Sequence, residues 1–225
     1  KAACLEMQDF LGVRQGDISI GGSTIPGEYI LPKVVGWFSK QYPGITLTLT
    51  VADSEEIESR VLEGEFELGV IGRKSSNKHL ETHELWKDEL VLALPSTHRL
   101  AGKKEVSLQE VVQEPFISRE LGSGTLKSME PYLQGAGLKG IESLHVVARL
   151  GTSTAVKEGI KAGLGISILS AIALETELKA GVLKAIRLKA IPMFRYFYLI
   201  RDKRRTASPL SRSLMDFLIT TSKQL

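Results

Sequence analysis

The 225-residue sequence contains a single cysteine, Cys4. No disulfide can therefore form within the chain, and nothing indicates an oxidising compartment. No stretch approaches the roughly 18 consecutive apolar residues of a membrane-spanning helix. Neither sign of charge dominates, because 29 Lys and Arg stand against 26 Asp and Glu, and the net charge of +3 is too small to indicate nucleic-acid binding by this chain. These absences predict a cytoplasmic protein that does not enter a membrane.

Motifs for catalysis and for metal binding are also missing. His79 and His83 are four residues apart, but Leu80 stands where a zinc-protease helix needs a glutamate. Residues 163–165 read Gly-Leu-Gly and lack the rest of the dinucleotide-binding fingerprint. The short basic run at 201–205 is more typical of a solvated turn than of a DNA contact. We therefore expect no catalytic residue, no metal site and no cofactor.

What the sequence does contain is an alternation of strand and helix patterns. The clearest strand signal is at 45–51, where Ile, Leu and Val alternate with threonine. In the first part of the chain the expected elements, in order, are a strand at Ile18–Ile20, a helix at Pro26–Tyr42, a strand at Ile45–Val51, a helix at Ser54–Leu62 and a strand at Phe66–Gly72. This β-α-β-α-β order predicts a parallel sheet with right-handed crossovers.

A second series of the same kind begins after Pro115. Its expected strands are Phe116–Ser118, His145–Arg149 and Ile166–Leu169, with helices ending near Gln134 and Ala162. Between the two series lie two short strand-like stretches, Glu84–Trp86 and Leu90–Leu94, and a helix opened by a capping box at Ser107. After the second series come a long strand, Arg195–Ile200, and a helix from Pro209. Open parallel sheets bind ligands beyond the carboxyl ends of their strands, and two such sheets facing each other would form a cleft.

Loops rich in Gly, Ser and Thr follow strand ends and precede helices in both series. Free backbone N–H groups and the positive end of the helix dipole point out of such loops, and a small carboxylate or oxyanion suits them. The candidate binding residues in these loops are Ser23, Thr24, Gly122, Ser123, Gly124, Thr125, Thr152 and Ser153. The alternative is that these hydroxyl residues only cap their own helices.

An arginine directly follows the first strand of the second series. Arg119 could donate a charge-assisted hydrogen bond to the same anion. Its neighbour Glu120 could equally neutralise it. Arg73 and Arg149 are weaker candidates, because surface arginines are the default.

Four segments resemble the effector-binding domain of LysR-type transcriptional regulators. The first contains GDISIG at 16–21, Leu-Pro at 31–32, Phe38 and Tyr-Pro at 42–43; the others are EGEFELGV at 63–70, VKEGIKAGLGI at 156–166 and Ser-Pro at 208–209. The resemblance extends over about residues 14–223, nearly the whole chain. Ser170 departs from the family, which commonly has proline there, and this leaves the expected fold unchanged.

The resemblance implies an α/β fold of two Rossmann-like subdomains, similar to that of type 2 periplasmic binding proteins. Residues 16–93 with 194–225 would form subdomain I and residues 94–193 subdomain II, after the end of a linker helix at 1–15. A small anionic effector bound between the subdomains would modulate DNA binding and transcription. Family effector residues would include Ser118 and the whole loop from it to Thr125, besides the loops at 23–24 and 152–153. The loop sequences look most like those of the subgroup linked to sulfur or selenium metabolism.

The resemblance also implies partners. The chain would form a homodimer through the helix at 26–42 and the strand at 45–51, with a tetramer as the alternative for the full-length protein, and would reach DNA only through an N-terminal domain that the chain lacks. Trp37 could serve this interface or could belong to the core of its own chain. A transporter's solute-binding protein, which shares the fold, is the alternative function; it would need an export signal, and the helical pattern from Lys1 argues against one. An enzyme ranks last.

Overall fold

The computed structural model describes residues 15–223, so the expected end of a linker helix at 1–15 lies almost entirely outside the described residues. The described residues divide into two compact units: residues 15–86 with 196–223, and Lys87–Arg195. Strands β4 (Leu80–Pro95) and β10 (Met193–Asp202) each run from one unit into the other. The boundaries expected from sequence, after residues 93 and 193, fall within these same two strands. No helix among residues 15–223 is long and apolar enough to cross a membrane.

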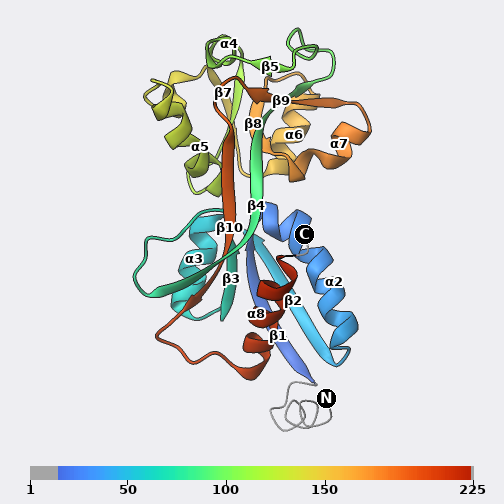
Figure 1. The fold of residues 1–225 in the computed structure, drawn as a ribbon, viewed down its shortest axis with the longest axis vertical. Coiled ribbons are helices and arrows are strands. Elements are labelled where there is room, and N and C mark those ends of the chain that lie inside the picture. Colours follow the sequence, from blue (N-terminus) through green and yellow to red (C-terminus); the bar gives the residue numbers. More distant parts are fainter. Residues whose placement is uncertain (1–14, 224–225) are drawn as a thin grey trace. The chain divides into compact units, whose positions relative to one another are not determined.

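The first unit follows the expected strand and helix order. Its elements are β1 (Gly16–Ser23), a π-helical turn (Pro26–Ile30), α2 (Leu31–Gln41), β2 (Ile45–Ala52), α3 (Ser54–Glu63), β3 (Leu68–Ile71) and, after β10, α8 (Pro209–Thr221) (Figure 1). Strand β1 pairs in parallel with both β2 and β3, whereas β10 adds antiparallel to β3. The predicted parallel β-α-β-α-β arrangement is therefore confirmed.

Helices cover both faces of this sheet. Consecutive β1 residues face opposite ways: a side chain at Gly21 would meet Ile57 of α3, and one at Gly22 would meet Leu31 of α2. On the α2 face, Phe38 packs edge-on against Phe217 of α8, with ring centroids 5.3 Å apart. The apolar stripes of three helices thus close the first unit's core on both sides.

The second unit contains more short elements than its sequence pattern predicts. They are β5 (Glu105–Val106), α4 (Leu108–Val112), β6 (Phe116–Arg119), α5 (Gly124–Gly135), a 3-10 turn (Ile141–Ser143), β7 (Val146–Leu150), α6 (Ser153–Lys161), β8 (Ser167–Ser170), a 3-10 turn (Ile172–Leu174), α7 (Glu175–Lys179) and β9 (Leu183–Leu188). Strands β6 and β7 are parallel, while β8 and β9 pair antiparallel with β4. Within β4, Leu90, Leu92 and Leu94 enter one core cluster and Val91 and Ala93 the other.

The two strand-like stretches expected at 84–86 and 90–94 are one continuous strand, β4. The pattern breaks at Lys87, Asp88 and Glu89, which read as a polar interruption. Asp88 is nevertheless buried, and its carboxylate bonds to Arg195, 107 residues away in the chain. A buried ion pair with a remote partner thus hides the middle of the strand from local pattern analysis.

The expected capping box at the start of α4 is present. Ser107 accepts from the Glu110 backbone, and the Glu110 carboxylate accepts from the Ser107 backbone N–H at 3.0 Å. A hydrogen bond from Lys103, followed by those from Ser107, lowers the pKa of Glu110 from 4.5 to about 2. The ionised carboxylate therefore holds both the cap and the lysine.

Replacing Glu110 with glutamine is expected to remove a pH-dependent part of the stability. Because the folded-state pKa of Glu110 is lowered to about 2, its ionised form stabilises the fold above the unfolded pKa of about 4.5, and this stabilisation is lost as the pH falls through about 2. Urea midpoints measured from pH 7 down to pH 2 should show a difference between wild type and E110Q that shrinks toward pH 2. A difference that stays constant over this range would contradict the assignment.

Candidate functional site

The loop after β1 contains the two candidates of the first unit. Ser23 is the last residue of β1 and Thr24 follows it, and both are buried. Just before them, a Cβ on Gly22 would lie 2.9 Å from the Gly27 Cα. Only glycine therefore lets the end of β1 approach the π-helical turn this closely.

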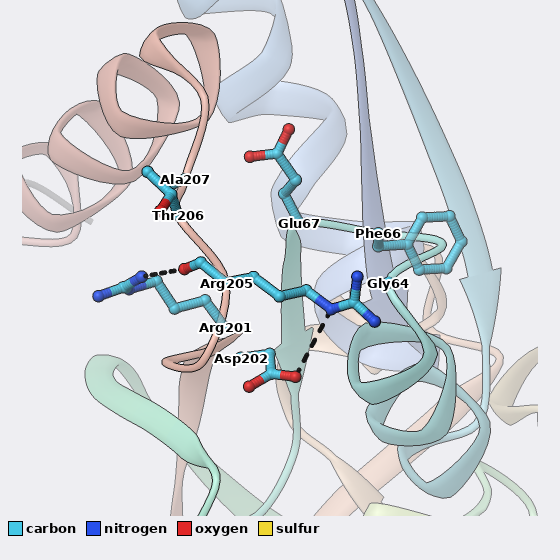
Figure 2. Close-up of a pocket in the computed structure, with 8 residues that line it drawn as sticks. All are labelled: Gly64, Phe66, Glu67, Arg201, Asp202, Arg205, Thr206 and Ala207. Atoms are coloured by element: carbon cyan, nitrogen blue, oxygen red, sulfur yellow. Dashed lines mark hydrogen bonds and ion pairs between the residues drawn. The ribbon is translucent and has the colours of Figure 1, made fainter.

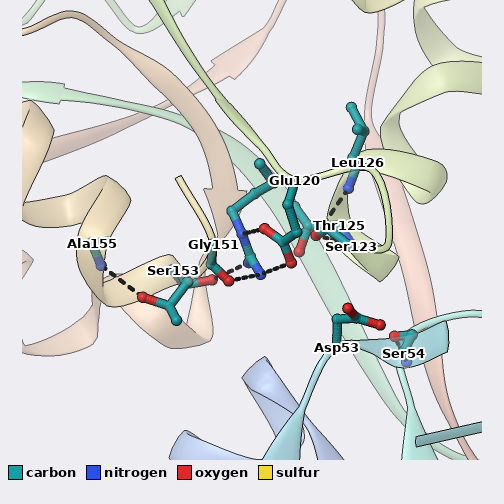
Figure 3. Close-up of polar contacts among 12 residues, drawn as sticks. Asp53, Ser54, Glu120, Ser123, Thr125, Leu126, Gly151, Ser153 and Ala155 are labelled. Carbon is teal, nitrogen blue, oxygen red and sulfur yellow. Dashed lines mark hydrogen bonds and ion pairs between the residues drawn. The ribbon is translucent and has the colours of Figure 1, made fainter. Parts of the chain in front are cut away.

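Two candidates of the second unit cap their helices. Ser123 is the N-cap of α5, where its Oγ accepts from the Thr125 N–H at 3.2 Å and from the Leu126 N–H at 3.5 Å (Figure 3). Thr152 is the N-cap of α6 and accepts from the Ala155 N–H at 3.0 Å. Both residues therefore cap their helices, as their positions predict. A capping hydroxyl uses its oxygen as acceptor, so its own O–H can still donate to a ligand.

Arg119, the last residue of β6, connects the two capped loops. Its Nη1 donates to Ser153 Oγ at 2.8 Å and its Nη2 to the Gly151 carbonyl at 3.3 Å. Its Nε and Nη2 also donate to the two carboxylate oxygens of Glu120, at 2.8 and 2.7 Å. Of the two roles that the sequence left open, the structure shows the one in which Glu120 neutralises Arg119. The three residues that accept these bonds, Glu120, Gly151 and Ser153, are labelled in Figure 3.

A second buried arginine was missed by the sequence analysis. Arg195 Nη1 donates to Thr125 Oγ1 at 3.0 Å, and its Nε bonds Asp88 Oδ2 at 2.8 Å. Asp88 also accepts from Ser170 Oγ at 2.7 Å. The side chains of Arg195 and Asp88 are 4% and 0% exposed, so Thr125 at the start of α5 is held by a buried network.

The charge of Arg119 acts on the second buried arginine, Arg195. Burial is the largest cause that lowers the pKa of Arg195, Asp88 acts against it, and the positive charge of Arg119 lowers the pKa further. These bonds form two groups, which we call together the second-unit polar cluster: Arg119 with Glu120 and Ser153, and Asp88 with Ser170, Arg195 and Thr125. Two arginines and two acids make its formal charge zero. The only sequence signal for its deepest part is a pair of charged residues, Asp88 and Arg195, inside apolar strand patterns.

The remaining candidates take less part in this cluster. Ser118 is buried on β6 and donates to the Arg119 carbonyl at 2.9 Å. Gly122 lies in the turn before α5 and Gly124 is the first residue of that helix. Arg73 binds Glu58 at 2.8 Å in the first unit, and Arg149 is exposed on β7, so neither belongs to the cluster.

The basic run at 201–205 forms a small pocket in the first unit (Figure 2). Its volume is about 30 Å³, enough for roughly one water molecule. Arg201 binds Glu81 at 2.5 Å, and Arg205 lies 3.7 Å from Asp202. A hydrogen bond from Arg204 is the main cause that lowers the pKa of Asp202 to about 2. The arginines of the basic run are therefore paired with acidic side chains of the chain itself.

No group of three or more His, Cys, Asp and Glu side chains among the described residues could hold a metal ion. The histidines at 79 and 83 lie in an irregular segment and in β4 rather than on a helix. The arrangement in the second unit instead offers backbone N–H groups, hydroxyls and guanidinium groups, which are donors for an anion.

Comparison with known proteins also indicates a ligand-binding domain. Residues 12–223 match the family model of the LysR substrate binding domain. The chain is 30% identical over 210 residues to the HTH-type transcriptional activator CmpR of Synechocystis sp., covering 93% of this chain and 67% of CmpR. The chain thus spans about two thirds of that regulator.

Two solved structures share the fold. The CcmR regulatory domain of Synechocystis in complex with 2-PG superposes with a TM-score of 0.85 and 27% identity, over 94% of this chain and 99% of that one. The effector binding domain of QuiR in complex with shikimate superposes with a TM-score of 0.84 and 22% identity, over 93% and 98% of the two chains. The expected α/β fold, like that of type 2 periplasmic binding proteins, is confirmed. These relatives favour a regulatory domain over a transporter's solute-binding protein and over an enzyme, and the chain belongs to the LysR substrate binding domain family, the effector-binding domains of LysR-type transcriptional regulators.

Proposed function

We propose that this domain senses a small anionic effector, which the N-terminal turns of α5 and α6 and the Arg119 guanidinium bind in the second unit. One observation carries the proposal: Arg119 Nη1 bonds Ser153 Oγ at 2.8 Å, so a buried cation lies directly at the start of α6. Helix N-termini attract anions because their first N–H groups lack partners within the helix. A guanidinium beside such a terminus adds two directed donors and a full charge.

The ligands of the two structural relatives support an anion. 2-Phosphoglycolate carries a phosphate and a carboxylate, and shikimate carries a carboxylate; both are negatively charged at neutral pH. Those molecules belong to CcmR and QuiR, and the effector of this chain is proposed only by class: a small carboxylate, phosphate or sulfate. Ser23 and Thr24 are proposed as effector residues from the family resemblance alone.

The wider role is proposed from the family. Effector binding would modulate DNA binding by a separate DNA-binding domain of a full-length cytoplasmic regulator, which would act as a homodimer or, in its full-length form, as a tetramer. Trp37 on α2 and Val51 on β2 are both exposed in this chain, which supports the dimer surface expected from sequence. The switch needs an effector with different affinities for two conformations, since only differential binding shifts an equilibrium.

Replacing Ser123 with alanine, or Thr24 with valine, is expected to weaken effector binding by about 1–2 kcal/mol each, because each change removes one hydroxyl donor. A thermal-shift screen with 2-phosphoglycolate, shikimate, sulfate and small carboxylates would first identify a ligand, since stabilisation rises with the ratio of ligand concentration to its dissociation constant. Calorimetry would then give the dissociation constants of both variants.

Ser107→Ala is the matched control, because Ser107 caps α4 as Ser123 caps α5 but is not a candidate binding residue. Both serine variants should lose about 1 kcal/mol of stability through the lost cap. Only S123A should also lose affinity. Equal affinities in S123A, T24V and wild type would remove these loops from the binding site.

A further inference from the structure

The guanidinium of Arg119 already holds a carboxylate on the side that an oxyanion would use. Glu120 Oε2 accepts from Nε at 2.8 Å and Glu120 Oε1 from Nη2 at 2.7 Å. This is the two-point geometry by which arginine binds carboxylates and phosphates in general. A carboxylate from the chain itself therefore stands where the anionic group of an effector would bind.

The two members of this pair differ strongly in exposure. The Arg119 side chain is 2% exposed and the Glu120 side chain 26% exposed. Arg119 is held from elsewhere by Ser153 and the Gly151 carbonyl, so its guanidinium stays in position without Glu120. The partly buried Glu120 carboxylate regains water when it leaves, whereas a buried guanidinium left without an anion strongly destabilises the fold. The favourable process is therefore an exchange, in which another anion takes the place of the Glu120 carboxylate on Arg119.

The other buried pair of the cluster lacks this asymmetry. Asp88 is 0% exposed and its carboxylate is shared between Arg195 and Ser170. Its release would leave three buried polar groups to satisfy at once. Asp88 is therefore a fixed counter-ion, and the carboxylate that can be exchanged is Glu120.

We propose that Glu120 is an internal stand-in for the effector: it neutralises Arg119 in the free domain and is displaced by the effector's oxyanion. This inference rests on the proposed function, because it concerns the same guanidinium. It makes Glu120 a specificity-determining residue. The incoming group must present two oxygens to Nε and Nη2, which selects carboxylate, phosphate and sulfate over halide ions, and it must compete with Glu120 for them.

Glu120→Gln removes the competing charge while keeping the side-chain size. The probes are sodium sulfate, sodium phosphate and sodium glycolate, measured by calorimetry and thermal shift with sodium chloride holding the ionic strength constant. E120Q is expected to bind sulfate about ten-fold more tightly than wild type or better, because a hydrogen-bonded ion pair no longer opposes the anion. Chloride alone should stabilise neither protein.

Two further variants keep the result interpretable. Glu158→Gln on α6 makes the same change in net charge at a side chain that is 64% exposed, and it should leave sulfate affinity at the wild-type value. The double variant Arg119→Gln with Glu120→Gln should lose the gain. Far-UV circular dichroism of each variant checks that the fold is retained.

The outcomes separate this inference from the proposed function. Equal sulfate affinity of E120Q, E158Q and wild type would overturn the stand-in role of Glu120, as would a gain that survives in the double variant. A gain in E120Q that depends on Arg119 supports that role. If the same experiments find no effector that binds the wild-type domain at the candidate loops, the proposed function fails while the masking of Arg119 by Glu120 stands.

Discussion

Asp88→Ala is expected to lower the free energy of unfolding by about 3–5 kcal/mol, the usual result of removing one partner of a buried ion pair. Arg195 would keep its charge at a side chain that is 4% exposed, and Ser170 would lose its acceptor. Burial lowers the pKa of Arg195, because desolvation disfavours its charged form. Urea unfolding at pH 7, followed by circular dichroism and by tryptophan fluorescence, measures the change.

Glu89→Ala is the matched control, since the next residue of β4 also pairs with an arginine. Glu89 binds Arg187 at 2.6 Å, but the Arg187 side chain is 66% exposed, and exposed pairs contribute about 1 kcal/mol or less. Replacing both Asp88 and Arg195 with apolar residues of similar size should cost less than D88A alone, because no unpaired charge is left. If D88A costs no more than E89A, the buried pair does not have the stabilising role assigned to it.

Gly165→Ala is expected to destabilise the chain by about 3 kcal/mol through forced overpacking. A Cβ at this position would lie 2.3 Å from the Pro115 carbonyl oxygen and 2.8 Å from its carbon. The obstacle is backbone, and the same carbonyl accepts from the Ile166 N–H at 2.8 Å. Relief of the clash would therefore disturb the start of β6, which positions Arg119. Unfolding in urea gives the loss of stability.

Gly36→Ala makes the same chemical change as Gly165→Ala, but we expect it to raise the stability rather than lower it. Gly36 lies within α2, and a Cβ there would meet no atom within 4 Å. Alanine should stabilise this exposed helical position by about 1 kcal/mol, because glycine loses more backbone entropy on folding. Similar effects of G165A and G36A would contradict the close approach of Gly165 to Pro115.

Much of the candidate site could be predicted because its signals are local. A hydroxyl residue between a strand pattern and a helix pattern indicates an N-cap, and Ser123 and Thr152 both cap as that signal predicts. The capping box at Ser107 follows from its spacing to Glu110. Glu120 adjoins Arg119 in sequence, so the sequence allowed their pairing as one alternative. It could not distinguish a paired Glu120 from one that is exposed to solvent.

The buried charges could not be predicted because their partners are remote in sequence. In the sequence, Asp88 has the pattern of a break between two strands. In the structure it pairs with Arg195, which lies 107 residues later in the chain. Arg119 reaches Ser153 across 34 residues. The residues next to a charged side chain in an apolar pattern do not indicate whether it has a counter-ion, because only folding brings the two charges together.

The strand and helix order of the first unit, the capped loop ends and the family were determined by the amino-acid sequence alone, because hydrophobic periodicity, turn residues and caps act over a few neighbouring positions. Only the tertiary structure decided that β4 is a single strand, that Glu120 rather than solvent faces Arg119, and that Arg195 holds the start of α5 through Thr125. The reason is physical: burial and ion pairing depend on which distant segments meet, and that is settled by packing of the whole unit rather than by any short stretch of chain.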